Sequence, residues 1–159
     1  MEHIVDLFTN FILMSAVAGW LTAQVLKGFT GIFRLKRFTV TEFLFGTGGM
    51  PSSHTAAVCA VVSACAIMFG VGSYQFALSG VLAMIVMRDA MGMRRQVGEH
   101  AKALNIIFKE LADAHNDPTL TQKALAELVG HTPLQVFVGA IVGVLVPIGM
   151  MFIPAFGVL

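Results

Sequence analysis

Near its C-terminus the chain contains 24 consecutive residues, Pro133 to Phe156, without a charged side chain. A helix of about 20 apolar residues spans the hydrocarbon core of a bilayer, so this run is long enough to cross a membrane. Over all 159 residues, 57% are apolar and only 12% are charged, whereas soluble domains carry about 25% charged residues. These proportions exclude an ordinary soluble surface and indicate a multi-span integral membrane protein.

Three further apolar stretches precede this run, and a tight turn over residues 70–73 separates two of them. We therefore predict an all-α integral membrane helical bundle of about four spanning helices: Leu7–Leu26, His54–Phe69, Val71–Met87 and Pro133–Phe156. The second and third stretches are short for spans, which a thinner bilayer or little tilt accommodates. The chain length fits one domain, so residues 1–159 are expected to form a single membrane-embedded unit.

Two polar connections link the predicted spans. In the first, Lys27–Gly49, the residues Phe38, Phe43 and Phe45 predict an interfacial or re-entrant helix. In the second, Arg88–Gly130, apolar residues recur at helical spacing and predict a cytoplasmic amphipathic helix: Val97, Ala101, Leu104, Ile107, Phe108 and Leu111. A second short helix is predicted after it, capped by Thr119 or Thr121 and ending at Gly130.

Charge and cysteine content limit the partners and the topology. The net charge of +1 does not suggest nucleic-acid binding. Both connections rich in Lys and Arg fall on one side of a four-span topology, and the positive-inside rule places that side in the cytoplasm, with the N-terminus outside. Cys59 and Cys65 lie six residues apart in one apolar run, a poor geometry for a disulfide, and are expected to be packing residues.

The polar side chains near the spans fall at the same membrane face. They are Lys27, Arg34, Ser52, Ser53, His54, Arg88, Asp89, Arg94, Arg95, His131 and Thr132. Ser52 or Ser53 is a good N-cap for the second span, and Thr132 followed by Pro133 is a good start for the fourth. Because helix N-termini attract anions, two such termini beside several cations predict a phosphate site.

Each of these residues alone also fits a structural role. A histidine at the end of a span can be interfacial, a serine can be only a cap, and flanking cations can be topology anchors. A metal site built from His54, Asp89, Glu99, His100 and His131 is a further alternative. Adjacent Glu99 and His100 diverge on a helix, and the excess of cations disfavours a divalent metal. We expect no metal and no cofactor, and the phosphate site depends on the whole set of residues.

Three segments resemble the motifs of the type 2 phosphatidic acid phosphatase superfamily, which includes vanadium haloperoxidases. "KGFTGIFR" matches its Lys-x6-Arg motif, "PSSH" is similar to Pro-Ser-Gly-His, and "GHTPLQVFVG" resembles the third motif. Together with "RDAMGMRR" they look closest to the divergent bacterial and plant branch, over nearly the whole chain. The resemblance implies a metal-independent phosphatase in the bacterial cytoplasmic membrane, acting through a phosphohistidine.

By position, the resemblance implies that His131 is the nucleophile and His54 the general acid. It assigns the phosphoryl oxygens to Lys27, Arg34, Ser52 and Ser53. Three positions depart from the family pattern: Leu35 for a proline, Leu125 for an arginine and Gln135 for an aspartate. Arg94 or Arg95 is expected to supply the missing cation. Gln135 is expected to orient His131 through its carbonyl, and Asp89 or Glu127 to take the role of the carboxylate.

The expected substrate is a lipid phosphate or diphosphate, reached from the bilayer. A cytoplasmic site, the side that we expect, suits phosphatidylglycerophosphate or phosphatidic acid, and an outer one suits a polyprenyl diphosphate. The alternative is a non-enzymatic protein that binds or transports an anionic lipid, which the departures at Leu125 and Gln135 favour. Four short spans make a thin bundle, which is compatible with a homo-oligomer.

Overall fold

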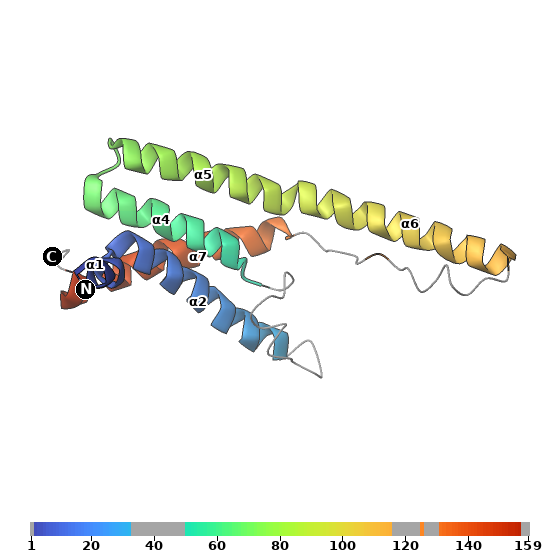
Figure 1. Cartoon of the computed structure of the whole chain (residues 1–159), viewed down its shortest axis with the longest axis horizontal. Coiled ribbons are helices and arrows are strands. Elements are labelled where there is room, and N and C mark those ends of the chain that lie inside the picture. Colours follow the sequence, from blue (N-terminus) through green and yellow to red (C-terminus); the bar gives the residue numbers. More distant parts are fainter. Residues whose placement is uncertain (1, 33–49, 116–124, 126–130, 157–159) are drawn as a thin grey trace.

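The computed structural model describes residues 2–32, 50–115, 125 and 131–156, and every regular element in this part of the chain is helical. The elements are α1 (Glu2–Thr9), α2 (Phe11–Ile32), α4 (Ser53–Phe69), α5 (Tyr74–Met91), α6 (Met93–His115), α7 (Pro133–Met150) and the short 3-10 helix η2 (Pro154–Phe156). Helices α2, α4, α5 and α7 form a bundle, and α6 continues α5 beyond its end (Figure 1). The predicted all-α membrane bundle is confirmed.

Three helical segments are long and apolar enough to cross a membrane by length and composition: Phe11–Thr30, Tyr74–His115 and Pro133–Met150. The remaining predicted span corresponds to α4, a shorter apolar helix at the centre of the bundle, where α2, α5 and α7 all contact it. Many large apolar side chains of the bundle point outward, as expected for helices surrounded by lipid.

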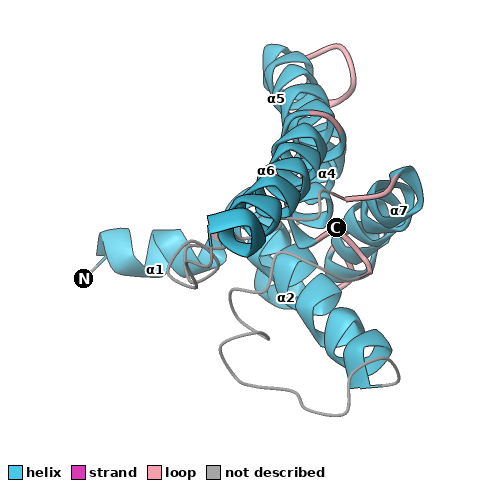
Figure 2. Ribbon diagram, turned by 90° about the vertical axis from the view of Figure 1, so that its right-hand side faces the viewer, coloured by secondary structure: helices cyan, strands magenta, loops and turns pink. Residues whose placement is uncertain are grey.

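The first predicted span differs from the observed helix at both ends. Asn10 interrupts the helix: its side-chain oxygen accepts the N–H of Leu13 over 3.0 Å and caps α2. The helix α1 before it projects to one side of the bundle (Figure 2). At the other end, α2 continues past Leu26 to Ile32, so the prediction that Lys27 follows the span was wrong, and Lys27 lies within the helix. Apolar content alone does not show whether a helix continues past a polar residue.

The α4–α5 connection agrees with the predicted turn. Gly70 ends α4 with a φ of 78°, a conformation that favours glycine. Ser73 then caps α5 by accepting the N–H of Phe76 over 3.2 Å. The third helix therefore begins at Tyr74 and extends to Met91, three residues later at the start and four at the end than predicted.

Small residues bring α4 close to its neighbours. A Cβ atom added to Gly139 would lie 2.5 Å from the carbonyl oxygen of Ser52, and one added to Gly143 would lie 2.5 Å from that of Ala56. On the other side, Gly19 of α2 faces Ala56 and Ala60. Close approach of backbones through small residues is the usual way in which membrane helices associate. It positions the starts of α4 and α7 beside each other.

The fourth predicted span ends earlier in the structure than predicted. Helix α7 ends at Met150, before Phe156, because Pro154 has no N–H and disfavours helix in the residue before it. The predicted amphipathic helix is confirmed as α6. The predicted helix at Phe38–Phe45 lies outside the described residues, and of the helix predicted after Thr119 only Leu125 is described, which is not helical.

Candidate active site

A continuous set of contacts joins the ends of four helices at one end of the bundle. The N–H of His131 donates to the carbonyl of Ala90 in α5 over 3.1 Å, and the N–H of Ser52 donates to the carbonyl of Gln135 over 3.0 Å. Ser53 then lies 3.5 Å from the ammonium of Lys27 in α2. We call the following residues the polar mouth: Lys27, Ser52, Ser53, His54, His131 and Gln135.

Of the two predicted candidates, Ser52 and Ser53, Ser52 is the N-cap of α4. It is fully buried, and its side-chain oxygen accepts the N–H of Thr55 over 3.4 Å and the hydroxyl of Thr55 over 3.0 Å. The N-terminus of α4 and its partial positive charge therefore open into the polar mouth. Ser53, the first helical residue, is also buried. Sequence analysis did not identify Thr55, which fixes the rotamer of this cap.

Lys27 lies near the end of a membrane helix, yet its side chain is buried, and only 6% of the residue's surface is exposed. Its ammonium nitrogen lies 3.5 Å from the hydroxyl oxygen of Ser53. One turn further on, the hydroxyl of Thr30 donates to the carbonyl of Met50 over 2.6 Å, so α2 also holds the chain just before α4. Buried lysines are rare, and a lysine that points into a polar site rather than toward water is suited to binding an anion.

Gln135 fixes the orientation of the His131 ring. The N–H of Thr132 donates to Gln135 Oε1 over 2.9 Å, so the oxygen of this amide faces the start of α7. The same oxygen lies 3.2 Å from His131 Nδ1. Because an amide oxygen only accepts, a hydrogen bond between them requires the proton on Nδ1. Nε2 of neutral His131 then carries the lone pair, which is the form that a nucleophile needs.

Thr132 and Gln135 form a capping box at the start of α7. The Thr132 hydroxyl accepts the N–H of Gln135 over 3.4 Å, while the Gln135 side chain accepts the N–H of Thr132. Pro133 occupies the first turn, as predicted. The residue that replaces the expected aspartate therefore has two functions: it closes the helix cap and it holds His131, which is only 4% exposed.

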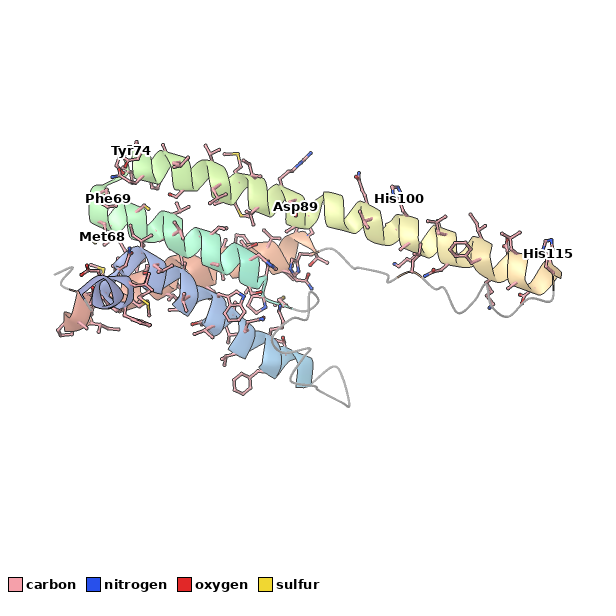
Figure 3. The ribbon with its side chains drawn as sticks, in the orientation of Figure 1. Met68, Phe69, Tyr74, Asp89, His100 and His115 are labelled. Atoms are coloured by element: carbon pink, nitrogen blue, oxygen red, sulfur yellow. The ribbon has the colours of Figure 1, made fainter. Side chains whose placement is uncertain are left out.

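His54 and Asp89 belong to two of the same helix ends, the start of α4 and the end of α5. His54 is the second residue of α4 and is exposed. Asp89 lies one residue before Ala90, at the end of α5 (Figure 3). His100 lies partway along α6, away from Asp89 (Figure 3). Among the residues that the structure describes, no group of three or more His, Cys, Asp or Glu could hold a metal ion.

The remaining predicted cations fall outside what the structure describes. Arg34 lies in the range 33–49, and the backbone of Arg94 and Arg95 begins α6 while their side chains are not described. Glu127, the second candidate for the carboxylate, lies in the range 126–130. The contribution of these four side chains to the polar mouth remains a prediction.

Leu125 occupies the position of an expected arginine, and the structure places it far from the polar mouth. Its N–H and carbonyl pair with the side chain of Asn105 over 2.8 and 3.0 Å. Asn105 lies 15 residues beyond Ala90 along α5 and α6, which corresponds to about 22 Å at 1.5 Å per residue. An arginine side chain cannot cover that distance, so a cation at position 125 would not reach His131 in this arrangement.

The fold and the polar mouth define a class: an all-helical integral membrane protein with a histidine-containing polar site at one end of its bundle. The model of the Divergent PAP2 family matches residues 8–146, and the chain therefore belongs to this family. The chain is 40% identical over 148 residues to the uncharacterized membrane protein YuiD of Bacillus subtilis (strain 168). This alignment covers 88% of this chain and 93% of that protein. No solved structure matches. Membership in this family points to a phosphatase-like role in the membrane.

Proposed function

We propose that this protein hydrolyses a lipid phosphate or lipid diphosphate through a phosphohistidine on His131. The observation that carries the proposal is the contact of His131 Nδ1 with Gln135 Oε1 at 3.2 Å, because Thr132 fixes that oxygen and the tautomer follows. A buried imidazole that keeps its proton on Nδ1 is in the tautomer whose Nε2 can attack phosphorus. Family membership supports the same chemistry.

The reaction has two steps. In the first, His131 Nε2 attacks the terminal phosphorus, the P–N bond forms, and the P–O bond to the leaving group breaks. The leaving group is the lipid alcohol from a monophosphate and the lipid monophosphate from a diphosphate. His54, protonated, gives its proton to the leaving oxygen. In the second step, water attacks the phosphorus and gives a proton to His54, the P–N bond breaks, and inorganic phosphate leaves. The exposed position of His54 at the start of α4 suits a group that meets both the leaving group and water.

The phosphoryl oxygens require several donors, since charge spreads over them in the transition state. Lys27 and Ser53 supply an ammonium and a hydroxyl, and the N-terminus of α4 adds its partial positive charge. We assign Arg34 and one of Arg94 and Arg95 as the further cations, as the family motif and the neighbouring sequence imply. The apolar helices bring the lipid chain to the same end of the bundle.

The experiment measures phosphate release from a panel in detergent: phosphatidylglycerophosphate, phosphatidic acid and a polyprenyl diphosphate. His131→Ala should abolish release, and His54→Ala should lower it by about 10²–10⁴-fold, the usual contribution of a general acid. His115→Ala, at the far end of α6, is the matched control and should release phosphate as the wild type does. Equal release by all four proteins would overturn the proposal.

A protein that binds or transports an anionic lipid without turnover is the second candidate, and the amide at Gln135 in place of a carboxylate favours it. Trapping the intermediate distinguishes the two. A substrate labelled in its phosphate should leave an acid-labile, base-stable label on the wild type and none on His131→Ala. Vanadate should inhibit release. Lipid binding without label or release would support the second candidate instead.

A further inference from the structure

Helix α6 has an apolar stripe that nothing in the described part of the chain covers. Val97, Leu104, Ile107 and Leu111 are 52%, 43%, 49% and 43% exposed. The neighbouring stripe is different: Ala101 and Ala112 are buried, and Asn105 between them holds the backbone of Leu125. The chain therefore covers one side of α6 with its own residues and leaves the adjacent apolar side open.

The lengths of α5 and α6 place this exposed stripe outside the bilayer. Helix α5 has 18 residues, which at 1.5 Å each give about 27 Å, close to the hydrocarbon thickness of about 30 Å. Helix α6 continues in the same direction for 23 residues, past the end of the bundle (Figure 1). Lipid can cover the apolar side chains of α5, but along this axis it does not reach those of α6, and exposing them to water is unfavourable.

The spacing of the stripe is that of a coiled coil. Together with His100 and Ala114, its four members form a series that alternates three and four residues apart: Val97, His100, Leu104, Ile107, Leu111 and Ala114. Val97, Leu104 and Leu111 repeat every seven residues in this series. Copies inserted in one membrane share one orientation, so two α6 helices can only meet in parallel. A parallel pair in register places each residue of the stripe against the same residue of its partner.

From this arrangement we infer that α6 is the dimerisation element of the protein, with a second copy of the same chain as its partner. The charges beside the stripe fit this pairing. Glu110 and His115 occupy flanking positions that face each other between the two helices of a parallel coiled coil, an acid opposite a base. Lys102 and Glu99 pair with each other at 3.8 Å on the far side, where solvent remains.

Disulfide cross-linking in native membranes tests the inference. Leu104→Cys and Ile107→Cys, made separately, should form dimers on mild oxidation, because identical residues face each other across the pair. Ile106→Cys is the matched control: Ile106 is 60% exposed on the same helix but points away from the stripe. Since disulfides require Cα atoms within about 7 Å, we expect roughly tenfold less dimer from it. The native Cys59 and Cys65 are buried, and wild type should not cross-link.

Two results would overturn the inference. One is cross-linking that is absent at 104 and 107, or equal at 106, with each variant present in the membrane at the wild-type amount. The other is contact of the stripe with lipid: a dye attached at Leu104→Cys would then be quenched by brominated acyl chains, as for a helix lying on the bilayer surface. A dimer should show no such quenching. These readouts do not depend on phosphatase activity.

Discussion

At the scale of single residues, Gln135 connects more parts of the candidate site than its predicted role of orienting His131 requires. Its side chain receives the N–H of Thr132 and contacts Nδ1 of His131, and its backbone carbonyl receives the N–H of Ser52. One residue thus joins the proposed nucleophile, the cap of α7 and the cap of α4. An amide can do this without charge, but it stabilises a positive imidazole less than a carboxylate does.

Substitutions at Gln135 should separate orientation from charge. Gln135→Leu removes the acceptor of Nδ1 and should lower phosphate release by about 10- to 100-fold, equivalent to about 1.5–3 kcal/mol for a hydrogen bond to a charged group. Gln135→Glu keeps the shape and adds a charge that stabilises the imidazole as it becomes phosphorylated. We expect it to raise release by about tenfold. A rate for Gln135→Glu at or below that of Gln135→Leu would exclude an orienting role.

Lys27 should act on substrate binding rather than on the fold. Lys27→Met keeps the length and apolar stem of the side chain and removes the ammonium next to Ser53. We expect kcat/KM to fall by about 10- to 100-fold. Thermal stability in detergent should be unchanged or higher, because a buried charge no longer has to be desolvated. Lys102→Met on the exposed surface of α6 is the control, and an equal loss there would contradict the assignment.

At the scale of elements, the sequence predicts the helices and their caps but not their contacts. Local signals identify the caps Ser52 and Thr132 and the turn at Gly70, because a cap depends on residues three positions away. The break at Asn10 and the burial of Lys27 depend on tertiary packing, which apolar content does not report. The spacing of Gly139 and Gly143 is visible in the sequence, but their partner, α4, is not.

The close contact between α4 and α7 should be sensitive to a single methyl group. In Gly139→Ala the new Cβ would lie 2.5 Å from the carbonyl oxygen of Ser52, so the helices must separate. Overpacking of this kind typically costs about 1–3 kcal/mol, and we expect a lower midpoint of thermal unfolding together with lower activity. Gly149→Ala in the same helix is the matched control, because its Cβ would meet nothing within 4 Å. Equal stability of the two variants would argue against tight packing at Gly139.

At the scale of the whole molecule, the bundle has two unlike ends. One end holds the polar mouth, and α6 extends from it; the other holds α1, η2 and the turn between α4 and α5 (Figure 1). Residues from four separate parts of the sequence meet at the first end. The order of the spans and the position of each polar residue in them were sufficient to predict that these residues meet. The distance of Leu125 from His131 was not predictable, since it depends on the length of α6 and on the Asn105 contact.

The two ends should label from opposite sides of the membrane. The turn at Gly70–Ser73 has no Lys or Arg, whereas α6 is rich in basic residues, so the positive-inside rule predicts that α6 and the polar mouth lie in the cytoplasm. In intact cells an impermeant maleimide should therefore label Val71→Cys, which is 72% exposed. It should label Gln96→Cys, also exposed, only in inverted vesicles. The reverse pattern would place the polar mouth outside, where it meets a polyprenyl diphosphate rather than an intermediate of phospholipid synthesis.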